Sequence, residues 1–251
     1  MKKVLLLSAV AVFLAVADCP AGLSETFNLT TAASHSPIPT SQLNGLSARA
    51  VFKWDSAAPA VMIIELTNTS TGVPSGFDNA QQILTGISFD FGEPGYNGDA
   101  VITGGTVVLG AGGACFNMDV TVGPGGDLSG EWGYGNMDGT GLLTNLVSAD
   151  QAQATCFGGA NLDGPPNIDG PQGGVVTNPP LVSMGGLGAV GDTVIITLNL
   201  DRSLTGLQFL YDNGVMCEFG SDAAFLVPEP ATMLLVGLGF AGLIGRKKTR
   251  S

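Results

Sequence analysis

Hydrophobic and polar residues alternate along several short stretches in the middle of the chain. A period of two is typical of a β-strand with one buried and one exposed face. The alternation is clearest in residues 192–200, 49–55 and 115–122. These stretches are therefore predicted strands. The side chains predicted to point inward are Val194, Ile196, Leu198, Leu200, Ala50, Phe52, Trp54, Phe116, Met118, Val120 and Val122.

Five further stretches have the length and composition of strands, with turn-forming Gly, Asn and Asp residues between them. They are residues 60–68, 83–91, 101–109, 204–211 and 223–227. The 38 glycines and 14 prolines of the 251-residue chain argue against long helices, although residues 142–154 allow a short one. We predict an all-β fold that consists of a single β-sandwich. The connections between its strands could be jelly-roll-like.

Two strand–turn–strand units of the sequence resemble each other. MIIELTN is followed by LTGISFDFG, and VIITLNL is followed by LTGLQFLYDNG. The spacing inside the two units differs by about a dozen residues, so we interpret them as two similar hairpins rather than as a true repeat. Their four strands are predicted to form the core.

The first 21 residues have the pattern of a secretory signal peptide. Lys2 and Lys3 precede an apolar stretch from Val4 to Val16, and small residues follow it. Cleavage is predicted after residue 17 or after residue 21. The apolar stretch is too short for a permanent membrane span, so the sequence predicts export.

The region between the two ends of the chain is strongly acidic. Residues 22–227 contain nineteen acidic residues and three basic ones, Arg49, Lys53 and Arg202, which gives this region a net charge of −16. The whole chain carries −12. Nucleic acid and anionic lipid repel a body of this charge, so nucleic acid is not expected as a partner.

The chain ends with Pro-Glu-Pro, a short apolar run and a basic cluster. As a helix, the 15 residues Ala231–Gly245 would span about 22 Å, whereas the hydrocarbon core of a bilayer is about 30 Å thick. Four of the last six residues are basic, and such a cluster resists crossing the membrane. The prolines beside Glu229 favour an extended peptide on the outer side.

This arrangement resembles the PEP-CTERM sorting signal of Gram-negative bacteria that make exopolysaccharide; the alternative is an ordinary tail anchor. The resemblance implies recognition by an exosortase at the inner membrane, removal of the tail, and delivery to the cell surface or extracellular matrix. We expect a signal peptide (1–21), an acidic all-β domain (22–227) and a sorting signal with a transmembrane segment (228–251). The matching residues are Val227, Pro228, Glu229, Pro230, Arg246, Lys247 and Lys248.

Cysteine usage fits an exported protein. Cys115, Cys156 and Cys217 lie in the predicted domain, and Cys19 joins them only if cleavage follows residue 17. We predict a disulfide between Cys115 and Cys156, which would close a loop of about 40 residues and contribute up to about 4 kcal/mol. A metal or catalytic role is less favoured, because Cys-x-x-Cys is absent and thiols oxidise outside the cytoplasm.

The sequence offers no catalytic motif, and apart from calcium no cofactor is expected. The single histidine, His35, lies in a stretch rich in Ser, Thr and Pro. G-x-S-x-G, H-E-x-x-H and phosphate-binding glycine loops are absent. NLDGPPNIDG repeats oxygen-bearing side chains that could wrap a calcium ion, although two Asx turns are the simpler explanation. The candidate ligands are Asn161, Asp163, Asn167 and Asp169.

Two classes of function remain. We favour a non-enzymatic surface or matrix protein with a structural, adhesive or polysaccharide-associated role. The alternative is a secreted carbohydrate-binding module or glycoside hydrolase, whose acid pair would leave no sequence signature among the loop carboxylates. Trp132 and Tyr134 could stack on sugar rings, or they belong to the core because they share one face of a strand.

Overall fold

The computed structural model describes residues 22–229 except 35, 78–79, 92–99, 117–121, 124, 136–142, 144, 150–159, 162–172, 208–213 and 221–223. In this part of the chain the regular elements are strands and short 3₁₀ turns. The strands are β1 (Leu23–Ala32), β2 (Ala48–Trp54), β3 (Val61–Asn68), β4 (Leu84–Phe89), β5 (Ile102–Leu109), β6 (Cys115–Phe116), β7 (Gly133–Gly135), β8 (Asn145–Ser148), β9 (Ala160–Asn161), β10 (Val175–Val176), β11 (Ala189–Gly191), β12 (Thr193–Leu200), β13 (Val215–Phe219) and β14 (Ala224–Pro228). The turns are η1 (Thr40–Gln42), η2 (Ala80–Gln82) and η3 (Ser129–Glu131).

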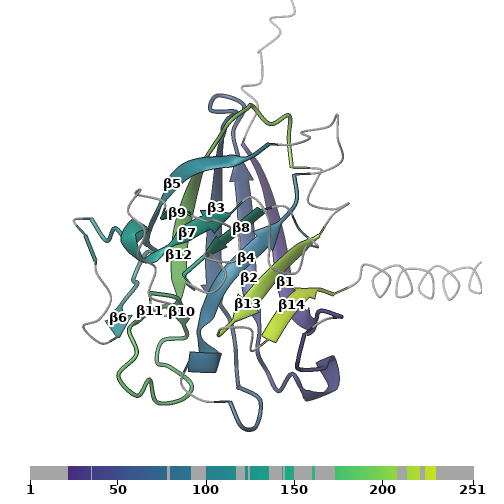
Figure 1. Cartoon of the computed structure of the whole chain (residues 1–251), viewed down its shortest axis with the longest axis vertical. Coiled ribbons are helices and arrows are strands. Elements are labelled where there is room, and N and C mark those ends of the chain that lie inside the picture. Colours follow the sequence, from purple (N-terminus) through teal and green to yellow (C-terminus); the bar gives the residue numbers. More distant parts are fainter. Residues whose placement is uncertain are drawn as a thin grey trace, which may run out of the picture.

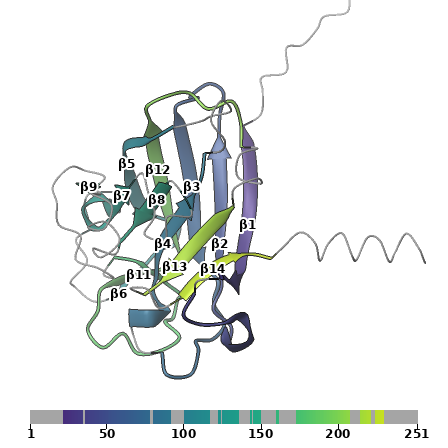
Figure 2. The ribbon, with the colours of Figure 1, turned by 45° about the vertical axis from the view of Figure 1, so that its right-hand side comes forward.

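The strands form one continuous curled sheet. Its main path runs β5-β12-β3-β2-β1-β14-β13-β4-β10-β11-β6, and β8, β7 and β9 branch from β4. We call β5, β12, β3, β2 and β1 the open arm, and β14, β13, β4 and β8 the covered arm. The two arms lie face to face, with β4 and β13 crossing in front of β2 and β3 (Figures 1 and 2).

The all-β prediction is confirmed, but the predicted sandwich of separate sheets is not. β14 is hydrogen-bonded to β1 on one side and to β13 on the other. The ladder therefore continues from one arm into the other without a break, and the two layers belong to a single sheet.

The open arm shows the alternation of burial that was predicted for β12, and β3 shares it. In β3 the side chains of Met62, Ile64 and Leu66 are buried, while the residues between them are half-exposed. The four residues predicted to point inward from β12 are buried, as are Ala50 and Phe52 in β2, and Trp54 packs half-buried against the core. Antiparallel strands with one face on the core and one in solvent have this pattern.

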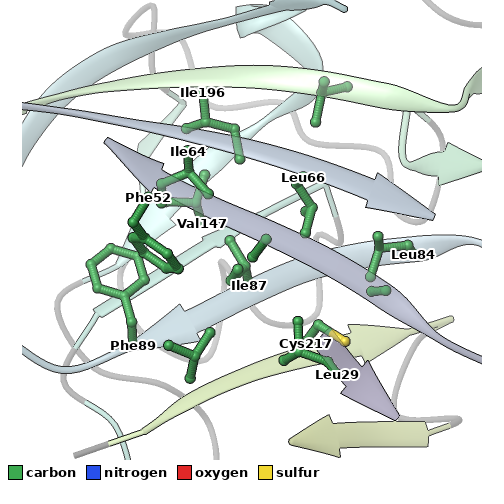
Figure 3. Packing of buried hydrophobic residues seen from close by; sticks show 14 of the residues in the cluster. Leu29, Phe52, Ile64, Leu66, Leu84, Ile87, Phe89, Val147, Ile196 and Cys217 are labelled. Atoms are coloured by element: carbon green, nitrogen blue, oxygen red, sulfur yellow. The ribbon is translucent and has the colours of Figure 1, made fainter. Parts of the chain in front are cut away.

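The core lies between the two arms. Phe52 of the open arm meets Phe89 of the covered arm edge-to-face, with ring centroids 5.4 Å apart. Phe27 and Phe91 extend this row of rings at centroid distances of 5.7 Å from Phe52 and 5.3 Å from Phe89. Figure 3 shows Ile64, Leu66 and Ile196 on one side and Ile87, Leu84 and Cys217 on the other.

The covered arm is buried on both faces. All six residues of β4 and all five of β13 are buried. Val215 and Cys217 of β13 belong to the core between the arms, whereas Met216 packs on the opposite face with Ala33, Leu143 and Phe225. This second layer of contacts removes the alternation of exposure that marks the open arm.

Two strand predictions need correction, and the stretch that allowed a helix contains a strand. Residues 115–122 form a strand only at Cys115–Phe116, residues 117–121 lie outside the described part, and Val122, predicted to point inward, is exposed. Of the predicted strand 204–211, residues 204–207 are not a strand, although Leu204 and Leu207 are buried in the core, and residues 208–211 lie outside the described part. Within the stretch that allowed a helix, Asn145–Ser148 forms β8, because its backbone pairs with β4 and β7.

The two similar units do contribute to the core. β3 and β12 are antiparallel neighbours, with Ile64 opposite Ile196, and β4 faces them from the covered arm. Three of these four stretches are therefore confirmed as strands of the core.

Candidate functional site

The start of the Pro-Glu-Pro sequence is part of the sheet. Val227 and Pro228 are the last residues of β14, where Val227 pairs with Thr31 and Pro228 pairs with Leu29 of β1. Glu229 is the first residue after the strand. Pro230, Arg246, Lys247 and Lys248 lie outside the described residues. The described part of the chain contains no helix that is both long and apolar enough to cross a membrane.

A β-bulge in β1 lies directly beside the Pro-Glu-Pro sequence. Between Leu29 and Thr31, β1 advances by two residues while β14 advances by one. Thr30 is therefore the extra residue, and a bulge of this kind changes the direction of a side chain. Pro228 fits at this position, because proline has no N–H to donate and is tolerated at bulges.

The hydroxyl group of Thr30 donates a hydrogen bond to Oε1 of Glu229 over 3.2 Å. The two residues are 199 positions apart in the sequence, and the contact is exposed to solvent. Thus Glu229, which follows β14, is hydrogen-bonded to the neighbouring strand β1.

Upstream contacts hold β14 firmly in the sheet. The N–H of Ala33 donates to the carbonyl oxygen of Phe225 over 2.7 Å, and the N–H of Phe225 donates to Oγ of Ser36 over 3.1 Å. The Phe225 side chain is buried with Met216, and Val227 packs against the same cluster. The segment that leads into Pro-Glu-Pro is a central strand that joins the two arms.

Of the two alternatives for Trp132, a sugar-stacking residue or a core residue, its position in the structure fits the second. Its side chain is 0% exposed, and its indole N–H donates to the carbonyl oxygen of Gly173 over 3.1 Å. Tyr134 packs half-buried against the same core. The shared face of these two residues is the core face, so the indole offers no surface to a ligand.

The two described cysteines lie in different environments. Cys115 is exposed in β6, and Cys217 is buried in β13. Burial raises the pKa of both thiols, and Cys217, which faces the core, is raised well above its usual range. Cys156 lies outside the described residues, so its disulfide with Cys115 stays a prediction.

The calcium site also stays a prediction. Of its candidate ligands, only Asn161 belongs to the described part, through its backbone in β9, while Asp163, Asn167 and Asp169 lie outside. Among the described residues no cluster of three His, Cys, Asp or Glu side chains could hold a metal ion.

The outer face of the open arm is a second candidate site. It carries aliphatic and hydroxyl side chains, and Thr67 and Thr193 are hydrogen-bonded across β3 and β12 at 2.9 Å. Two of the three basic residues of the domain, Arg49 and Lys53, lie on it, and Lys53 forms an ion pair with Glu65. One end of the face has an apolar pocket of about 230 Å³. Its lining consists of Leu23, Lys53, Trp54, Val61, Ile63 and four neighbouring residues, Gly22, Ser24, Asp55 and Ala58.

Sequence reasoning missed Thr30 because β1 was not predicted. A signal was present, since Phe27 and Leu29 alternate with Thr26, Asn28 and Thr30 over a stretch rich in β-branched residues. The contact with Glu229 itself had no sequence signal, because it depends on a bulge between strands from opposite ends of the domain.

Comparison with known proteins identifies one segment. Residues 226–248 match the model of the PEP-CTERM protein-sorting motif. No curated protein and no solved structure is significantly similar to the chain. The match begins inside β14, at Leu226, and includes Glu229, which accepts the hydrogen bond from the bulge residue Thr30. The chain therefore carries a PEP-CTERM sorting motif at its C-terminus, of the kind that directs an exported protein to an exosortase.

Proposed function

We propose that this protein is a non-enzymatic component of the cell surface or extracellular matrix of a Gram-negative bacterium. Export through a signal peptide and transient anchoring by the C-terminal segment would precede release of the tail by an exosortase. The observation that carries this proposal is the sorting motif at residues 226–248, which begins within the last strand of the domain and continues beyond it.

The outer face of the open arm is the surface that we assign to this role, with exopolysaccharide as its partner. Thr193, Thr197 and Asn199 offer hydroxyl and amide groups to sugar hydroxyls, and the half-exposed Ile63 and Ile195 offer apolar area to the C–H faces of sugar rings. The face has low charge within an acidic domain, since Glu65 is paired with Lys53. It can therefore approach a polymer with little repulsion.

Two variants of the full chain test the sorting step. Replacing Arg246, Lys247, Lys248 and Arg250 with Gln should release full-length protein into the periplasm. Without the basic cluster, the short apolar run is retained only weakly in the membrane. Glu229→Ala should instead leave full-length protein in the inner membrane. Fractionation with intact-mass measurement distinguishes these outcomes, and normal processing of both variants would refute the proposal.

A matched pair of charge variants tests the surface role. Ile63→Asp adds a carboxylate to the outer face of the open arm, whereas Ser203→Asp adds one at an exposed position outside the strands. We expect only Ile63→Asp to lose the fraction of processed protein that cosediments with matrix polysaccharide. Equal retention of both variants would contradict the assignment of this face.

A further inference from the structure

We infer that Thr30 is a positioning residue for exosortase processing, because it holds the carboxylate of Glu229 where the sheet ends. This inference rests on the proposed function and adds a residue outside the sorting motif to its recognition. Its evidence is the hydrogen bond of 3.2 Å between the Thr30 hydroxyl and Oε1 of Glu229, together with the bulge that directs Thr30 toward it.

The domain gives Glu229 a fixed starting point. Pro228 is paired with Leu29, and β14 lies between β1 and β13 in the middle of the sheet. Glu229 is therefore separated from a rigid strand by a single peptide bond rather than by a linker. A peptide that is already ordered loses less conformational entropy when an enzyme binds it.

The contact with Thr30 leaves most of the carboxylate available. The hydroxyl uses one oxygen of Glu229, and the side chain remains exposed to solvent. Among the described residues no cation is paired with Glu229. An ionised carboxylate accepts several hydrogen bonds, so an enzyme can recognise Oε2 while Thr30 still orients the group.

The bulge explains why Thr30 is suited to this role. In a regular antiparallel pair successive side chains of β1 would continue to alternate between the two faces of the sheet. The extra residue at Thr30 breaks that alternation opposite Pro228, where the proline has no N–H for the ladder. The local irregularity thus brings a side-chain donor to the end of β14.

Three variants of the full chain, produced in cells that contain an exosortase, test the inference. Thr30→Val keeps the β-branched shape and strand preference but removes the hydroxyl. Thr30→Ser keeps the hydroxyl, and Thr31→Val removes the neighbouring hydroxyl, which makes no hydrogen bond to Glu229. The measurement is the half-time for conversion of full-length to processed protein in a pulse–chase experiment.

We expect Thr30→Val to slow conversion by about three- to tenfold, the effect of losing one hydrogen bond, and the other two variants to match the parent. An unchanged or faster conversion of Thr30→Val would overturn the inference. So would an equal slowing by Thr31→Val, because loss of any hydroxyl from β1 would then suffice.

A coupled variant separates positioning from a general structural effect. Insertion of Gly-Ser-Gly-Ser between Val227 and Pro228 moves Glu229 away from Thr30. In that background Thr30→Val should have no additional effect on conversion, whereas an equal effect in both backgrounds would contradict a direct role. Glu229→Ala and the variant without the basic cluster complete the set: normal processing of both would refute the proposed function itself, whereas blocked processing of Glu229→Ala together with unslowed conversion of Thr30→Val would refute only this inference.

Discussion

The two arms of the sheet use the same kinds of strand in different ways. The open arm buries one face and leaves the other half-exposed, as the alternating burial of β3 and β12 demonstrates. The covered arm buries both faces, and β4 and β13 contain no exposed residue. The arm that is continuous with the sorting motif is therefore the one fixed from both sides, while the other arm keeps a face free for contact.

The largest expected loss of stability comes from replacing Phe52, whose ring packs between the two arms. Phe52 is fully buried in the open arm and packs against Phe27 and Phe89. Phe52→Ala should lower the free energy of unfolding by about 3–5 kcal/mol, because it leaves a cavity between the arms. Urea unfolding of segment 22–229 measures this change. The unfolding is monitored by circular dichroism, and we expect a β-type spectrum for the folded segment.

Ile63→Ala is the matched control for Phe52→Ala, because Ile63 pairs with the next residue of β2, Lys53, on the opposite face of the sheet. Its half-exposed side chain should contribute about 1 kcal/mol or less. Similar losses for Phe52→Ala and Ile63→Ala would mean that the open arm is covered in solution.

The outer faces of the two arms can be compared directly with Leu146→Ala and Ile195→Ala. Leu146 is buried in β8, whereas Ile195 is half-exposed in β12. We expect a loss of about 2–4 kcal/mol for Leu146→Ala and about 1 kcal/mol for Ile195→Ala, because only the first substitution leaves a cavity. Equal values from urea unfolding would remove the distinction between the arms.

The same distinction explains how much of the fold the sequence predicted. Strands β2 and β12 were predicted because apolar and polar residues alternate in their sequences, and β3 was predicted from its length and composition. β13, with the sequence VMCEF, has no such alternation because both faces are buried, and it was missed. β8 lies in a stretch whose sequence allowed a short helix, and its pairing with β4 decides its conformation.

The functional elements divide in a similar way. The sorting motif was predicted from the order of Pro-Glu-Pro, apolar run and basic cluster, which are all local in sequence. Thr30 could not be predicted as its partner, because the bulge and the contact both depend on the pairing of the first strand with the last. The hydrogen bond of the buried Trp132 likewise joins residues that are distant in sequence, since its acceptor is the carbonyl oxygen of Gly173.

A smaller effect is expected from the ion pair on the outer face of the open arm. The charged groups of Lys53 and Glu65 link neighbouring strands, but both side chains remain partly exposed. Lys53→Gln and Glu65→Gln should each reduce the free energy of unfolding by about 0.2–1 kcal/mol, and a double-mutant cycle isolates the pair. The coupling should weaken in 1 M NaCl, because salt screens exposed charges. A coupling that survives high salt would indicate that this face is less accessible to solvent than we describe.

The smallest effect concerns the outer edge of the open arm, where Asp127 and Ser129 cover the end of β5. The Ser129 hydroxyl and N–H both donate to Oδ1 of Asp127, over 2.6 and 3.0 Å, and these bonds lower the pKa of the carboxyl group. The Oγ atom of Ser129 also accepts a hydrogen bond from the N–H of Val107 over 3.0 Å, so Asp127 and Ser129 together connect the turn to β5.

Because the pKa of Asp127 is lower in the folded state, its stabilising contribution is present above the unfolded pKa of Asp, near 4, and is lost as pH falls through the folded value. Asp127→Asn should abolish this pH dependence while changing the stability at pH 7 by less than about 1 kcal/mol, since solvent screens the exposed group. Carboxyl-carbon NMR titration of Asp127 gives its pKa directly, and Ser129→Ala should move this pKa only part of the way back toward its ordinary value, because the N–H of residue 129 still donates to Oδ1. An unshifted Asp127 in the parent chain would show that the turn does not hold this edge of the open arm in solution.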